Sequence, residues 1–212
     1  MLNATEEAKF AELRDKSREL RVPCLPEMFI DLKVHDKNGV LVFDDRQRGH
    51  SWVRGYYNAL AYSHFRSQIG SGLGAGSLEC VRYDDGVNVF FDDFFFLNVI
   101  EVGTSDTAWS AEQVQLAALI LDGTEAGNLT HGALAYQDAV YDAETKIWSG
   151  GPYRTFTNNS GSAITVKEAA LVHSYNTPNM YSRDVLDPAV EVAPLEVLTV
   201  TFNIALDFSA ID

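Results

Sequence analysis

The stretch Leu198-Thr-Val-Thr-Phe-Asn-Ile-Ala-Leu-Asp-Phe208 alternates apolar and polar side chains along its length. Every second residue from Leu198 to Phe208 is apolar, and the residues between them are polar except for Ala205. A period of two residues is typical of a β-strand that buries one face and exposes the other. This stretch therefore predicts an amphipathic β-strand.

Turn sequences separate the other strand candidates at short intervals. The turn 36–39, with its Asn-Gly pair, is a strong hairpin signal, and the turns 142–145 and 158–161 indicate two more hairpins. Short strands separated in this way indicate a mainly β protein built as an antiparallel, jelly-roll-like β-sandwich. The strands that flank the three turns are expected at residues 28–35, 40–43, 133–141, 146–148, 153–157 and 164–175.

An N-terminal helix is expected at residues 3–21, which are rich in Glu, Lys, Arg, Ala and Leu. Its apolar stripe is narrow, because Phe10, Leu13 and Leu20 recur on one side among charged residues. Such a helix packs on its own domain or on a partner chain. We therefore interpret residues 1–27 as a helical arm, with Phe10, Leu13 and Leu20 as candidate partner-docking residues.

The remaining residues, 28–212, form the predicted sandwich domain. An additional helix is expected at residues 50–66, where apolar side chains recur with a helical period. A glycine-rich loop, 67–77, follows it, without the preceding strand and following helix that a phosphate-binding loop needs. The aromatic residues of 87–102 indicate two buried strands, and 109–121 fits either a helix or an extended segment.

Net charge restricts the classes of partner. Thirty acidic residues against sixteen Lys and Arg give −14, so a clustered cationic surface for nucleic acid is not expected. Nine of the sixteen cations lie in residues 1–48 and four in residues 87–212, which favours a docking end of mixed charge and an acidic end in solvent. The chain has no run of about 18 apolar residues, so no membrane span is expected.

No catalytic or metal-binding motif stands out. The five histidines are scattered, Cys24 and Cys80 form no C-x-x-C pair, and neither an EF-hand loop nor a G-x-S-x-G elbow is present. We therefore expect a protein that is not an enzyme and has no metal or cofactor. In the absence of a signal pattern, we expect synthesis in a cytoplasm, with both cysteines reduced.

One cation stands out in the acidic part of the chain. Arg183 lies beside the apolar pair Val185-Leu186, in a region that has few other cations. A carboxylate partner is expected for it, and Glu168, within a strand candidate, is the residue that we favour. The alternative is a free arginine on the surface.

Aromatic side chains support a second hypothesis, in which a sandwich surface binds sugars. Trp109, Trp148 and Tyr153 are the candidate glycan-stacking residues. The competing interpretation is that these rings belong to the core, as most aromatic side chains of a β-sandwich do. A third hypothesis, an enzyme that acts on polysaccharide or peptidoglycan, requires two close carboxylates, which cannot be singled out among thirty acids.

Strand-and-turn phrases that cover most of residues 28–208 resemble structural proteins from the virions of tailed bacteriophages and related prokaryotic viruses, of fibre, decoration or tail type. The phrases are VHDKNGVLVF (34–43), GHSWVRGYYNAL (49–60), VGTSDTA (102–108), YRTFTNNSGSAITVKEAALV (153–172), SRDVL (182–186) and LEVLTVTFNI (195–204).

The resemblance implies a virion location after assembly in the host cytoplasm. It implies a role as a head or neck fibre, a capsid decoration, or a tail or baseplate subunit, with other virion structural proteins as partners. A homo-oligomer is expected, because virion components assemble with symmetry. The alternative function is a glycan-binding module that recognises a host-surface glycan.

Overall fold

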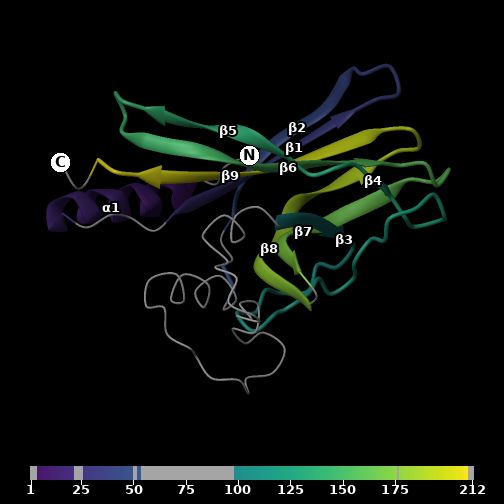
Figure 1. Cartoon of the computed structure of the whole chain (residues 1–212), viewed down its shortest axis with the longest axis horizontal. Helices are drawn as coiled ribbons and strands as arrows, with labels where there is room; N and C mark the ends of the chain where they lie inside the picture. The colour runs from purple at the N-terminus through teal and green to yellow at the C-terminus, as the bar shows by residue number, and fades with distance from the viewer. Residues whose placement is uncertain (1–3, 22–25, 50–51, 54–97, 176, 210–212) are drawn as a thin grey trace, which may run out of the picture.

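The computed structural model of the 212-residue chain describes residues 4–21, 26–49, 52–53, 98–175 and 177–209. These residues form one helix and nine strands, which confirms the expected mainly β fold with an N-terminal helix (Figure 1). The elements are α1 (Ala4–Leu20), β1 (Glu27–His35), β2 (Leu41–Gly49), β3 (Asn98–Gly103), β4 (Thr130–His131), β5 (Ala135–Asp142), β6 (Ile147–Thr157), β7 (Ile164–Tyr175), β8 (Thr177–Val192) and β9 (Val197–Asp207).

The strands form two antiparallel sheets of unequal size. Sheet A has the order β2-β1-β9-β6-β4, and β5 also pairs with β6. Sheet B has the order β3-β7-β8. Figure 1 shows α1 at the end of sheet A where the C-terminus also lies.

The core lies between the two sheets, because alternate residues of each strand point inward. The even-numbered residues of β1 from Met28 to Val34 are fully buried, as are the even-numbered residues of β9 from Leu198 to Phe202. Each such side chain contributes about 1.5–3 kcal/mol through burial. Sheet B contributes the facing apolar residues Ile100, Val102, Ile164, Val166, Leu171, Val190 and Val192.

β9 is the amphipathic strand that the alternating pattern predicts. It lies in the interior of sheet A, paired with β1 on one side and β6 on the other. The alternation of burial is clear from Leu198 to Phe202 and weakens at Ile204, which is half-buried. Phe208 follows the last strand residue and is exposed.

Two of the three predicted hairpins are confirmed. Between β1 and β2, the Asp36 carboxylate accepts hydrogen bonds from the backbone N–H groups of Asn38 and Val40, each at 2.8 Å. Gly39 takes a φ of +80°, which glycine adopts without steric cost. Between β5 and β6, Asp142 accepts a similar bond from the N–H of Glu144 at 2.8 Å.

The third hairpin prediction, around residues 158–161, is wrong because β6 and β7 belong to different sheets. The buried Asn158 amide donates to the carbonyls of Ser162 and Val192, each at 2.7 Å. The Asn158 backbone N–H also donates to the carbonyl of Glu196. These bonds tie the turn to the end of β8, so the chain crosses between the sheets instead of folding back on β6.

The strands predicted at 146–148 and 153–157 are parts of one strand, β6, which continues through Gly150-Gly151-Pro152. β2 likewise extends to Gly49, beyond the predicted 40–43. In both cases pairing with a neighbouring strand maintains the extended backbone where local propensity is weak.

The helix predicted from residue 50 does not include Trp52 or Val53. Trp52 forms a β-bridge with Ser182, and the Val53 N–H donates to the Tyr181 carbonyl at 2.9 Å. The contact with β8 overrides the helical period here, because Val53 gains a fully buried position against that strand. The following predictions lie outside the described residues: the rest of helix 50–66, the loop 67–77, the strands predicted between 78 and 97, Cys24 and Cys80.

The segment 104–121 contains no helix, so the helical alternative at 109–121 is wrong. Most of the segment is irregular, and its last residues run beside β3, where Leu119 forms a β-bridge with Gly103. The segment covers the outer side of sheet B, where Leu116 packs with Ala170, Val172 and Met180. Arg183 and Glu168 are buried beneath it and form the ion pair that the sequence predicts. Within the described residues, no helix is both long and apolar enough to cross a membrane.

A candidate binding groove on the outer side of sheet A

α1 covers one end of the outer side of sheet A, the side away from the core. Arg48 of β2 forms ion pairs with Glu7 of α1, at 2.6 Å, and with Glu27 of β1. Its guanidinium also lies 3.9 Å from the centre of the Phe10 ring. Arg14 of α1 pairs with the same Glu27 at 2.6 Å. The arm therefore docks on its own domain, mainly through charged groups.

A second contact holds the C-terminal turn of α1. Arg18 lies 3.4 Å from the Asp207 carboxylate and donates to the Ser209 hydroxyl at 2.9 Å. Burial alone would raise the pKa of Asp207, but hydrogen bonds from Ser209 and the charges of Arg18 and Arg14 lower it overall. The carboxylate is thus stabilised in its ionised form by the helix that it holds.

The three candidate docking residues have different surroundings. Phe10 is half-buried against Arg48 and belongs to the contact between α1 and the sheet. Leu13 and Leu20 are 59% and 68% exposed. The structure therefore leaves Leu13 and Leu20, but not Phe10, on the solvent side of the helix.

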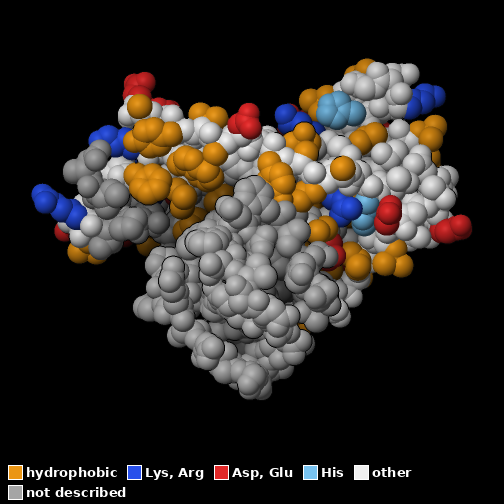
Figure 2. Space-filling view, in the orientation of Figure 1, with side chains coloured by type: hydrophobic (Ala, Val, Ile, Leu, Met, Phe, Trp, Pro, Cys, Tyr) orange, Lys and Arg blue, Asp and Glu red, His pale blue; other side chains and the backbone are white. Residues whose placement is uncertain are grey.

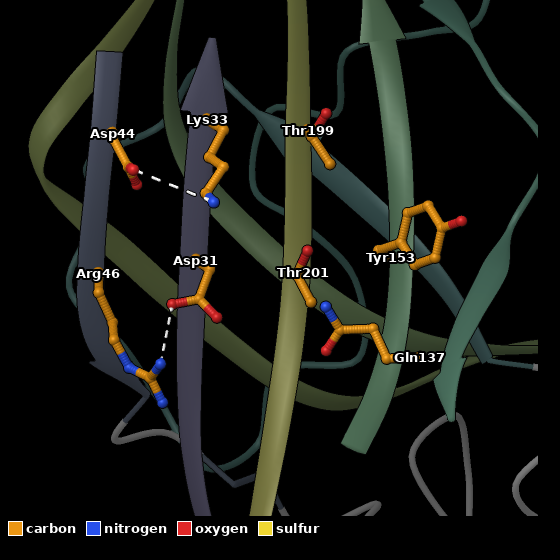
Figure 3. Close-up of a pocket in the computed structure, with 8 residues that line it drawn as sticks. All are labelled: Asp31, Lys33, Asp44, Arg46, Gln137, Tyr153, Thr199 and Thr201. Carbon is orange, nitrogen blue, oxygen red and sulfur yellow. Dashed lines mark ion pairs between the residues drawn. The ribbon is translucent and has the colours of Figure 1, made fainter. Parts of the chain in front are cut away.

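A polar groove with a volume of about 500 Å³ lies on the same side of sheet A as α1. Its lining comes from five strands, β2, β1, β9, β6 and β5, in the order in which they cross the sheet (Figure 3). The lining residues are Asp44 and Arg46, Lys33 and Asp31, Thr199 and Thr201, Tyr153, and Gln137.

Strand register brings these side chains together. Asp31 pairs with Arg46 across β1 and β2 and with Thr201 across β1 and β9, and Thr201 in turn pairs with Tyr153 of β6. Residues that pair across strands point to the same side of a sheet. Because the inward residues of β1 and β9 are the even-numbered ones, these odd-numbered partners share the outer side.

Two loose ion pairs form one wall of the groove. Arg46 Nη1 lies 3.5 Å from Asp31 Oδ1, and Lys33 Nζ lies 4.0 Å from Asp44 Oδ2 (Figure 3). Burial raises the pKa of Asp31, although the charges of Arg46 and Lys33 oppose the shift. The wall thus carries two negative and two positive groups. Burial makes ionisation of one of them, the Asp31 carboxylate, less favourable.

Small side chains form the floor and larger ones the opposite wall. Thr199 and Thr201 of β9 lie between the charged wall and Tyr153 (Figure 3). Gln137 of β5, which pairs with Gly151 of β6, lies on the same side of the sheet as Tyr153. The groove therefore combines hydroxyl groups, an amide and one aromatic ring.

The candidate glycan-stacking residues do not form one platform. Tyr153 lines the groove, but Trp148 lies five residues earlier on β6 and so points to the core side of sheet A. Trp109 lies on the irregular segment that covers sheet B, and it is 44% exposed. Of the three, only Tyr153 contributes to the groove.

Sequence reasoning did not identify the other groove residues. The alternation of β9 does place Thr199 and Thr201 on a polar side, and that signal was available. The convergence of Asp31, Arg46 and Gln137 depends on the order of strands in the sheet, which the sequence pattern does not specify.

The described residues contain no group of three or more His, Cys, Asp or Glu side chains arranged to hold a metal ion. The chain matches no protein-family model, no curated protein and no solved structure.

Proposed function

We propose that the protein is a structural component of a tailed-phage virion that acts by protein–protein assembly, as a fibre, decoration, tail or baseplate subunit. The resemblance of its strand-and-turn phrases to virion structural proteins supports this proposal. The observation that carries it is an exposed apolar surface at the α1 end of the molecule.

This surface, which we call the α1-end surface, is the solvent side of α1. Leu13 and Leu20 of α1 are exposed, as are Tyr136, Val140 and Tyr141 of β5. The strand register places Tyr136 and Tyr141 on the core side of sheet A, with Tyr141 beside Trp148 and Leu206, whereas α1 docks on the outer side. These two tyrosines are therefore exposed at the same end of the sheet but on the side away from α1. Figure 2 shows apolar side chains gathered at the end of the molecule where β5 and β9 lie.

Exposed apolar groups gathered at one place mark a surface that a partner covers. Charged residues dominate the rest of the solvent side of α1, so contact with a neighbouring subunit would bury the leucines within a polar rim. The occupant that we propose is an adjacent virion subunit, either a second copy of this chain or another structural protein.

The test is incorporation into particles. Phage that carry the variant Leu13→Asp with Leu20→Asp should contain at least tenfold less of this chain than wild-type particles. The matched control is Leu195→Asp, because Leu195 is 54% exposed and precedes the opposite end of β9. The proposal fails if purified wild-type particles lack the chain, or if the double variant is incorporated as well as the control.

A further inference from the structure

We propose that the outer groove of sheet A is a binding site for a neutral oligosaccharide. This inference goes beyond assembly, because it assigns a ligand to a surface separate from the exposed leucines of α1. It rests on the charge balance, the hydrogen-bonding groups and the aromatic wall of the groove.

The charge balance disfavours an ionic ligand. The groove holds Asp31, Asp44, Lys33 and Arg46, whose charges sum to zero. A phosphate or a carboxylate would be repelled by the two carboxylates that lie beside the two cations. A cationic ligand would be repelled by Lys33 and Arg46 in the same way. A ligand without charge meets no such repulsion.

The hydrogen-bonding groups suit a ligand that both donates and accepts. The separations in the two ion pairs, 3.5 and 4.0 Å, exceed the roughly 2.7–2.9 Å of a charge-assisted hydrogen bond. The charged groups therefore retain capacity for ligand hydroxyls. Thr199, Thr201 and the Gln137 amide add groups that donate and accept, which matches a chain of sugar hydroxyls.

The groove also offers an apolar surface in one place. Tyr153 is its one aromatic residue, and Figure 3 shows the Tyr153 hydroxyl directed away from the charged wall. The ring thus lies between this hydroxyl and the floor residues Thr199 and Thr201. A sugar ring has one face of C–H groups that can lie against an aromatic ring, while its hydroxyls reach the polar side chains.

The backbone of the floor is not available to a peptide. β1, β9 and β6 are each paired on both sides within sheet A, so their N–H and C=O groups are used by neighbouring strands. Strand addition, which relies on an open edge, cannot occur in the groove. Recognition in the groove must therefore come from its side chains.

Isothermal titration calorimetry of the full chain against neutral oligosaccharides of glucose, galactose and mannose tests the proposal. At least one should bind, and Tyr153→Ala should weaken binding at least tenfold, whereas Tyr153→Phe should retain it within about threefold. Thr201→Val, which keeps the shape of the floor but removes a hydroxyl, should also weaken binding. If Tyr153→Ala does not fold, the loss of binding in Thr201→Val tests the proposal instead.

The matched control is Tyr136→Ala, because Tyr136 is also partly exposed but belongs to the core side of the neighbouring strand β5. It should bind like the wild type. The proposal is overturned if none of the neutral oligosaccharides binds at millimolar concentration, if an anionic sugar binds more tightly than the neutral ones, or if Tyr136→Ala weakens binding as much as Tyr153→Ala. Isolated subunits suffice, so the result does not depend on particle incorporation.

Discussion

Arg183 Nε donates a hydrogen bond to Glu168 Oε2 at 2.6 Å, and both residues are fully buried. The remaining groups of the pair are also satisfied. Arg183 donates to the Thr107 carbonyl at 2.8 Å, and Glu168 Oε1 accepts from the Ala118 N–H at 3.1 Å. The pair therefore connects β7 and β8 to the irregular segment that covers sheet B.

Removing one partner of this pair should strongly destabilise the fold. Glu168→Gln or Arg183→Met should each lower the free energy of unfolding by about 3–5 kcal/mol, because each leaves a buried charge without its counterion. Urea unfolding measures the change. Lys167→Ala is the control, since its pair with Asp106 is exposed and should contribute less than about 1 kcal/mol. Equal losses for Lys167→Ala and Glu168→Gln would contradict this assignment.

Gly151 should tolerate no side chain. A Cβ at this position would lie 1.8 Å from the Phe202 carbonyl oxygen in the adjacent strand. Gly151→Ala should therefore cost at least about 3 kcal/mol, measured by urea unfolding. Gly161→Ala is the comparison, because its Cβ meets no atom within 4 Å and only the positive φ of 81° opposes it, at about 1–2 kcal/mol. A smaller loss at Gly151 than at Gly161 would refute the steric argument.

The contact between α1 and Asp207 should weaken in acid. The folded-state pKa of Asp207 is lowered, so its contribution to stability is present above the unfolded value of 3.8 and is lost as the pH falls through the lowered folded value. Amide hydrogen exchange in α1, compared between wild type and Asp207→Asn, isolates this contribution from that of the other carboxylates. The difference between the two proteins should disappear in that acidic range. A difference that grows in acid would contradict the prediction.

Asp31 should show the opposite pH dependence. Its folded-state pKa is raised, so the folded protein binds the proton more tightly than the unfolded chain. The contribution of Asp31 to stability should therefore rise as the pH falls through the raised pKa towards 3.8. Arg46, Lys33 and Asp44 are the charged groups that face it. Thermal unfolding of wild type and Asp31→Asn at several pH values measures the difference, and the prediction fails if the relative stability of the wild type falls in acid.

Several parts of the fold follow from local sequence. The alternation of 198–208 indicates a half-buried strand, and Asp36 with Gly39 specifies a tight turn, because each pattern depends on residues close in the chain. The pairing of Arg183 with Glu168 was also predictable, since a buried cation in an acidic region needs a carboxylate. Local sequence does not distinguish a turn within one sheet from a turn between two sheets, and the hairpin expected at 158–161 was wrong for that reason.

Most of the candidate groove could not be predicted from the sequence. Thr199 and Thr201 follow from alternation, but Trp148 and Tyr153 are expected on two separate strands, and only their place on one continuous strand shows that they point to opposite sides. The helical period at 50–66 was misleading at Trp52 and Val53 for a similar reason. Their contacts with β8 involve residues more than 120 positions away.

The sequence by itself determined the β-rich class, the N-terminal helix, two hairpins and the acidic charge, because propensity, periodicity and turn chemistry are properties of short segments. Only the tertiary structure decided which strands share a sheet, where α1 docks, and that Asp31, Thr201 and Tyr153 lie side by side. The physical reason is that strand order is selected by the burial of many side chains at once, and this collective term is not encoded in any one segment.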